Sequence, residues 1–185
     1  MITYAGIGSR TITKEEESLI IKISETLSSK RLVVYSGNAE GSDIAFQTGS
    51  KGKCVLMLPW HKFNESMYDV NNSLANYSLG KSKEALLTVD KYHPAALNLS
   101  FGAKAMMARN WHQIAGYDIY PQVSFVVCCA DVSNGKVSGG TGQACRIAED
   151  LGIPVFNIRH EWKEQRHVLK KLIKSLIERE AHGKV

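Results

Sequence analysis

The sequence predicts an α/β fold in which a mainly parallel, five-stranded sheet is covered by helices on both faces. Strand-like and helix-like segments alternate along the 185 residues. The strand-like segments are nearly continuous apolar runs, which is typical of parallel strands buried on both faces. Three of these runs are followed by a Gly-rich segment that leads into a helix. We see no internal repeat or linker, so we expect one domain over residues 1–185.

The predicted elements follow one another from the N-terminus. Thr13 and Glu16 form a capping box that begins the first helix. The second helix is expected to begin just before Asp43, and later helices are expected over 83–92, from Pro94 to Ala115, from the Gly-rich run at 139 through Asp150, and over about 161–180. The predicted strands cover residues 2–5, 31–35, 54–58, 123–129 and 154–158.

The segment from Trp60 to Gly80 is irregular, polar and aromatic. It is long for a structureless loop, which indicates either a functional loop or a short helix that the pattern does not place. Its aromatic side chains could form a lid that stacks on a base, but a local packing cluster is favoured. They are Trp60, His61, Phe63 and Tyr68.

The formal net charge is +5, and the segment from Arg159 to Val185 holds +4 of it. The last helix is favoured as a surface helix with its charged face in water; the alternative is a phosphate-contacting stripe that includes Lys170, Lys171 and Lys174. A signal peptide and a membrane span are not predicted, and the four cysteines are expected in the core of a cytoplasmic protein. The histidine spacings predict no metal site, and we assign no catalytic residue and no cofactor.

Gly-rich segments at the ends of parallel strands are candidate anion sites, because ligands bind there and helix N-termini offer free amides. This is the arrangement of a doubly wound, Rossmann-like sheet. In the second segment, Asp43 could hold a ribose hydroxyl or cap the loop amides. The first segment contributes Gly6, Gly8, Ser9 and Arg10; the second contributes Ser36, Gly37, Asn38, Glu40 and Asp43; the third contributes Ser138, Gly139, Gly140, Thr141, Gly142 and Gln143.

The third segment is the most specific of the three. It is neither a Walker loop, since no Lys follows its last Gly, nor the G-x-G-x-x-G fingerprint. We expect amides 140–143 to face a phosphate, with Ser138 and Thr141 as side-chain donors and with the anion where a side chain at Gly140 would lie. Arg109 and Asn110, late in a helix, form a fourth candidate element.

Taken together, these motifs resemble the DNA-processing protein A (DprA/Smf) family and the superfamily that it shares with the LOG, lysine-decarboxylase-like proteins. The matching segments are Ala5–Arg10, Ser36–Asp43, Arg109–Gly116 and Ser138–Phe156, and they cover nearly the whole chain in order. The compact form is similar to DprA-like proteins of bacteriophages. The resemblance implies a Rossmann-like domain that binds single-stranded nucleic acid.

Three departures qualify the implied function. Asn38 replaces a usual Gly, Gln47 replaces a usual His, and Arg146 stands where the resemblance to LOG hydrolases would put a catalytic Glu. The first hypothesis is therefore a non-catalytic phosphate-binding domain for single-stranded nucleic acid or a nucleotide. The alternatives are a sensor or sponge for a nucleotide signal, as in phage anti-defence, and a nucleotide N-glycosidic hydrolase that uses Glu40, Asp43 or Glu149. A homo-oligomer is possible.

Overall fold

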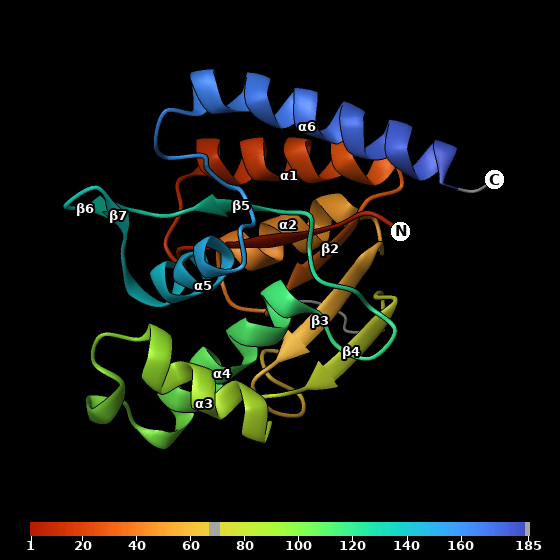
Figure 1. Ribbon diagram of the computed structural model, residues 1–185. Coiled ribbons are helices and arrows are strands. Elements are labelled where there is room, and N and C mark those ends of the chain that lie inside the picture. The colour runs from red at the N-terminus through yellow and green to blue at the C-terminus, as the bar shows by residue number, and fades with distance from the viewer. Residues whose placement is uncertain (67–70, 184–185) are drawn as a thin grey trace.

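A six-stranded sheet forms the centre of the computed structural model, which describes residues 1–66 and 71–183 (Figure 1). Its strand order is β4-β3-β2-β1-β5-β8, and every neighbouring pair is parallel. A small antiparallel hairpin of β6 (Val132–Ser133) and β7 (Lys136–Val137) follows β5. The strands of the main sheet are β1 (Thr3–Gly8), β2 (Val33–Ser36), β3 (Cys54–Leu58), β4 (Ala75–Ser78), β5 (Phe125–Cys129) and β8 (Val155–Asn157).

The predicted α/β class and parallel sheet are confirmed, but the count of five strands is wrong. The sixth strand, β4, lies inside the segment that the sequence indicated as a loop or short helix. It is an edge strand whose residues alternate between half-buried and exposed, and it carries no apolar run. Tyr68, of the predicted aromatic cluster, lies outside the described residues.

The helices are α1 (Lys14–Ser29), α2 (Ser42–Ser50), α3 (Lys83–Tyr92), α4 (Phe101–Ala115), α5 (Gly139–Asp150) and α6 (Trp162–His182). The capping box of α1 is present, with the Thr13 hydroxyl accepting from the Glu16 amide and the Glu16 carboxylate accepting from the Thr13 amide. The helix predicted to start at Pro94 is wrong at its beginning. A short 3-10 turn over Ala96–Asn98 comes first, and Ser100 then caps α4.

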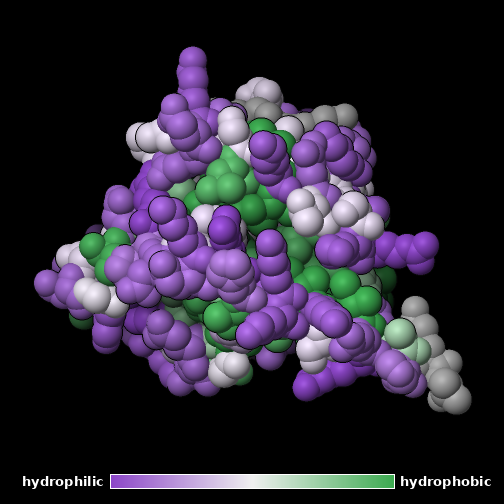
Figure 2. Space-filling view, turned by 90° about the horizontal axis from the view of Figure 1, so that it is seen from above, coloured by the Kyte–Doolittle hydropathy of each residue, from purple (hydrophilic) through white to green (hydrophobic). Residues whose placement is uncertain are grey.

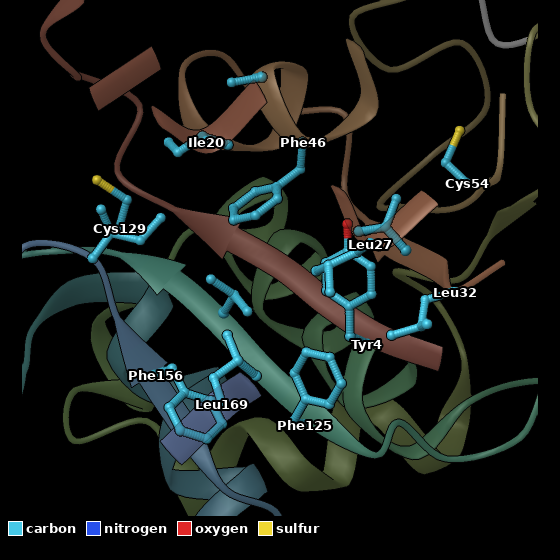
Figure 3. Packing of buried hydrophobic residues seen from close by; sticks show 14 of the residues in the cluster. Tyr4, Ile20, Leu27, Leu32, Phe46, Cys54, Phe125, Cys129, Phe156 and Leu169 are labelled. Carbon is cyan, nitrogen blue, oxygen red and sulfur yellow. The ribbon is translucent and has the colours of Figure 1, made fainter. Parts of the chain in front are cut away.

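The two faces of the sheet are covered by different helices, as predicted for buried parallel strands. Helices α1, α2 and α6 pack on one face, and α4 and α5 pack on the other, with α3 lying against α4. In β1, Tyr4 points into the core on the face covered by α1, α2 and α6, and Ala5 points into the core on the face covered by α4 and α5. Figure 3 shows Tyr4 beside Phe125 among side chains of α1, α2 and α6. The ring centroids of Tyr4 and Phe125 are 5.5 Å apart.

The chain reverses direction across the sheet between β1 and β5. It first moves outward through β2, β3 and β4, and then returns to the other side of β1. The carboxyl ends of β1 and β5 lie side by side, with Gly8 in register with Cys129. This is the topological switch point, where open α/β sheets bind their ligands.

None of the described helices is long and apolar enough to cross a membrane. No group of three or more His, Cys, Asp or Glu side chains among the described residues could hold a metal ion. The four cysteines are buried, which confirms their predicted place in the core.

Candidate functional site

A pocket of about 340 Å³ opens at the switch point, between the ends of β1 and β5, the N-terminus of α5 and one side of α4. It brings together parts of all four sequence motifs. The predicted residues that line it are Gly8, Ser9, Arg10, Asp43, Arg109, Asn110, Ser138, Gly139, Gly140 and Thr141.

The first motif forms the end of β1 and the turn that follows it. The Ser9 amide donates to the Cys129 carbonyl at 2.8 Å, and the Ser9 carbonyl accepts from the amide and hydroxyl of Ser42. A Cβ on Gly8 would lie 2.5 Å from the Cys129 carbonyl oxygen, so only glycine fits there. Gly6 lies within β1 against Phe46 and outside the pocket lining.

Arg10 is the exposed cation of the pocket. Its guanidinium reaches toward α4, where Nη2 lies 3.0 Å from the Met106 sulfur. A thioether is a weak acceptor, so this contact leaves the guanidinium able to bind a stronger one. Arg10 therefore supplies positive charge at the edge of the pocket.

Asp43 organises the second motif from within. Its Oδ2 accepts from the amides of Gly37 at 3.1 Å and Ala39 at 3.3 Å, and it pairs with Arg109 Nη2 at 3.7 Å. Of the two roles that the sequence left open for Asp43, this geometry is that of the loop cap. Burial raises the pKa of Asp43, while the Arg109 charge and the two amides oppose that shift.

Arg109 lies in the wall of the pocket, where its side chain is buried. Its guanidinium covers Gly37 so closely that a Cβ there would lie 1.6 Å from Nη1. Nη1 also donates to Gln113 Oε1, and burial lowers the pKa of the guanidinium. The Arg109 guanidinium therefore interacts mainly with Asp43 and with the loop after β2.

The other predicted residues of the second motif lie outside the pocket lining. Asn38 is buried at a φ of 58°, and its Nδ2 donates to the Phe63 carbonyl at 2.7 Å. Ser36 donates to the Gly6 carbonyl, and Glu40 is exposed. Asn38 and Ser36 therefore support the loop structure, and Asn38 ties it to the segment after β3.

The third motif begins α5 and leaves amides free at the pocket. The first helical hydrogen bond runs from the Gly142 amide to the Ser138 carbonyl at 3.0 Å, and Ser138 provides no side-chain cap. Within the described part of the chain, the amides of Gly139, Gly140 and Thr141 have no hydrogen-bond acceptor. The free amides are thus 139–141 rather than the 140–143 expected from the sequence.

The side-chain details of this motif also differ from the expectation. A Cβ on Gly140 would meet the Met107 methyl at 2.8 Å, whereas one on Gly139, at a φ of +64°, would enter open space. The Ser138 hydroxyl donates to the Asp131 carbonyl. Gly142 packs on Val137, and Gln143 is buried, outside the lining, where it accepts from Asn110 at 2.8 Å.

Arg159, which the sequence motifs did not include, holds the pocket's first loop in place. It makes a bidentate pair with Glu16 at 2.5 and 2.9 Å and donates to the Thr11 carbonyl at 2.7 Å. The pairing lowers the pKa of Glu16 to about 2. Nη1 of Arg159 also pairs with Asp131, a largely exposed residue of the pocket lining. Other lining residues that the motifs missed are Met106, Met107, Gln113 and Ala130.

The arrangement suits anion binding better than acid–base chemistry. Unbonded amides at a helix N-terminus, with a nearby Arg, attract phosphate. The acidic residues of the lining, Asp43 and Asp131, both pair with arginines. Arg146 donates from Nε to the Tyr92 carbonyl, and Glu149 is exposed near the other end of α5.

The fold and the pocket at its switch point define a Rossmann-like α/β protein, and DNA processing protein A has the same fold. The structure from Helicobacter pylori, described for its binding mode for single-stranded DNA, matches with a TM-score of 0.57 and 18% identity, covering 98% of this chain and 81% of that one. The structure from Streptococcus pneumoniae matches with a TM-score of 0.55 and 21% identity, covering 92% of this chain and 56% of that one.

A third solved structure, the structural-genomics target TM1055, matches with a TM-score of 0.54 and 15% identity, covering 84% of this chain and 72% of that one. No family model and no curated protein matches the chain. At these identities the likenesses establish the fold, and they confirm the predicted DprA-like, Rossmann-like architecture. This chain spans little more than half of the S. pneumoniae protein.

Proposed function

We propose that this protein binds single-stranded nucleic acid by holding a phosphate at the N-terminus of α5. The observation that carries the proposal is the set of three unbonded amides, of residues 139–141, in a pocket that also contains Arg10. A helix N-terminus carries roughly half a positive charge, and its amides point at the ligand. Arg10 adds a full charge that can make a bidentate contact with a phosphate.

Three further observations support nucleic acid as the ligand. The fold neighbour from H. pylori binds single-stranded DNA. The net charge of this chain is +5, which favours a polyanion. The pocket volume of about 340 Å³ suits one nucleotide unit of a strand, because small-ligand sites begin at about 300 Å³.

The same pocket size supports the second candidate, sequestration of a free nucleotide. Met106 and Met107 give the pocket an apolar wall on which a base could lie. Mass spectrometry of small molecules released from the purified protein distinguishes the two. A stoichiometric nucleotide favours the sponge, whereas an empty protein that binds oligonucleotides favours the nucleic-acid function. N-glycosidic hydrolysis has less support, because Asp43 is committed to Arg109 and the loop amides.

The test is oligonucleotide binding measured by fluorescence anisotropy at several salt concentrations. Each phosphate contact on a single strand contributes about −0.7 to the slope of log K against log salt. We expect Arg10→Gln to weaken binding and to reduce the magnitude of the slope by about that amount. Lys83→Gln, an equal charge change on an exposed residue of α3, is the matched control and leaves the slope unchanged.

A second variant distinguishes the pocket from the basic face of α6. Lys170, Lys171 and Lys174 are exposed on that helix, which lies on α1 (Figure 1). If their replacement by Glu abolishes binding while Arg10→Gln retains it, the phosphates follow α6 and the proposed site is wrong. Lack of oligonucleotide binding at low salt would remove the nucleic-acid function altogether.

A further inference from the structure

A second concave surface lies away from the phosphate pocket, between α1 and α6. This α1–α6 groove has a volume of about 190 Å³. Its floor is apolar and is formed by Leu27 of α1 and by Leu169 and Ile173 of α6, with Ile23 and Trp162 on its walls. Figure 2 shows this face from above, with apolar side chains in green between hydrophilic ones.

The charged side chains that line the groove all have one sign. The charged side chains that line it are Lys22 of α1 and Arg166 and Lys170 of α6. All three residues are exposed, and no ion pair with a described residue is found for any of them. Lys174, one turn further along α6, pairs with Glu178 and so differs from them. The groove therefore combines an apolar floor with uncompensated positive charge on both walls.

We propose that the α1–α6 groove is a docking site for an acidic amphipathic helix of a partner protein. Such a helix presents apolar residues at i, i+3, i+4 and i+7 to the floor and carboxylates to the basic walls. From Trp162 to Ile173 the groove wall extends about 16 Å along α6, which matches about three turns of a partner helix. This inference is independent of the proposed phosphate site.

The charge pattern and the shape argue against other occupants. A second copy docking with the same face would bring Arg166 and Lys170 toward their own counterparts, and like charges oppose such contacts. A bilayer needs apolar side chains that protrude, whereas Leu27, Leu169 and Ile173 are buried at the base of a groove. An acidic amphipathic helix fits the concave apolar floor and complements the positive charge of the walls.

The test uses the full chain and a labelled synthetic helix of about 14 residues, with Leu at i, i+3, i+4 and i+7 and Glu at most other positions. A scrambled peptide of the same composition is the peptide control. Anisotropy should show saturable binding of the amphipathic peptide only. Trp162 lies in the groove, so binding should also change the intrinsic fluorescence, and Trp162→Phe should remove that change.

Charge reversal then tests the walls. Arg166→Glu with Lys170→Glu should weaken peptide binding at least about tenfold, because two attractive contacts become repulsive. The matched control, Lys83→Glu with Lys136→Glu, makes the same change in net charge at exposed residues of α3 and β7 and should bind normally. Thermal melting verifies that both variants are folded.

Three results would overturn the proposal. The first is equal binding of the amphipathic and scrambled peptides, or no binding of either peptide. The second is binding to anionic phosphatidylglycerol vesicles that the Arg166/Lys170 reversal abolishes while the peptide does not bind, which would assign the groove to a membrane. The third is concentration-dependent dimerisation that the reversal increases, which would show that the groove joins two copies of this chain.

Discussion

Placing a carboxylate at Gly139 probes the free amides of α5 most selectively. Gly139 is the first residue of the helix, and a Cβ built on it would have no atom within 4 Å beyond its own residue, the adjacent residues and the local helix backbone. Its φ of +64° lies in the left-handed region, which Asn and Asp tolerate better than other residues with a side chain. Gly139→Asp and Gly139→Asn therefore differ in charge but hardly in size or backbone cost.

The expected magnitudes follow from this geometry. The backbone strain costs about 1 kcal/mol in both variants, which lowers the melting temperature by about 2–4 °C in a chain of this size. In Gly139→Asp, attraction between the carboxylate and the helix N-terminus offsets about 0.3–1 kcal/mol of this. The same carboxylate occupies or repels the phosphate. Two charges about 4 Å apart repel by about 1 kcal/mol in water and about 4 kcal/mol near a protein surface.

We therefore expect Gly139→Asp to bind single-stranded DNA at least about fivefold more weakly than Gly139→Asn, at equal or higher stability. Anisotropy titrations at low salt measure the first quantity, and thermal melts measure the second. If the two variants bind equally while both stay folded, no phosphate lies at the N-terminus of α5. Gly140 is a poorer probe, because a side chain there would meet the Met107 methyl rather than open space.

Three other substitutions test the supporting structure. Gly37→Ala should destabilise the fold by about 1–3 kcal/mol, because a Cβ at 1.6 Å from Nη1 moves the end of the Arg109 side chain away from its buried carboxylate partner; an unchanged melting temperature would contradict this. Pairing with Arg159 lowers the pKa of Glu16 to about 2, so the pair contributes stability that is complete above about pH 4.5 and is lost as the pH falls toward 2. Arg159→Ala should therefore reduce the pH dependence of the melting temperature over that range. His112 donates from Nδ1 to the Gly116 carbonyl, and burial lowers the pKa of the His112 imidazole. The folded protein should therefore lose stability as the pH falls below about 6.5, by at most about 1.4 kcal/mol per pH unit. His112→Gln should remove that dependence, and melts between pH 5 and 7.5 measure it.

The elements that the sequence predicted correctly are those whose signal is local. Buried strands such as Cys54–Leu58 are continuous apolar runs, and the capping box at Thr13 marks the start of α1. Strand β4 was missed because an edge strand with exposed alternate residues has no such run. The break before α4 had a local signal, Ser100 as a capping residue, but the longer helical pattern obscured it.

The site was predictable where motifs follow strand ends and not where tertiary packing decides. Strand order places the turn at Gly8 beside the start of α5, as the switch-point rule implies. The sequence pattern alone does not reveal that Gln143 turns inward to Asn110, or that Arg109 is committed to a buried carboxylate. Arg159 is distant in sequence from every motif that it contacts, so no spacing rule could find it.

The proposed function requires the amides of residues 139–141 and the guanidinium of Arg10 to hold a phosphate of a single strand. The most direct measurement follows the amide and Arg side-chain NMR signals of isotope-labelled protein during titration with an oligothymidine. We expect saturable shifts centred on Gly139, Gly140, Thr141 and Arg10, with the same affinity at each. Shifts confined to α6, with the α5 N-terminus unchanged at saturation, would contradict it.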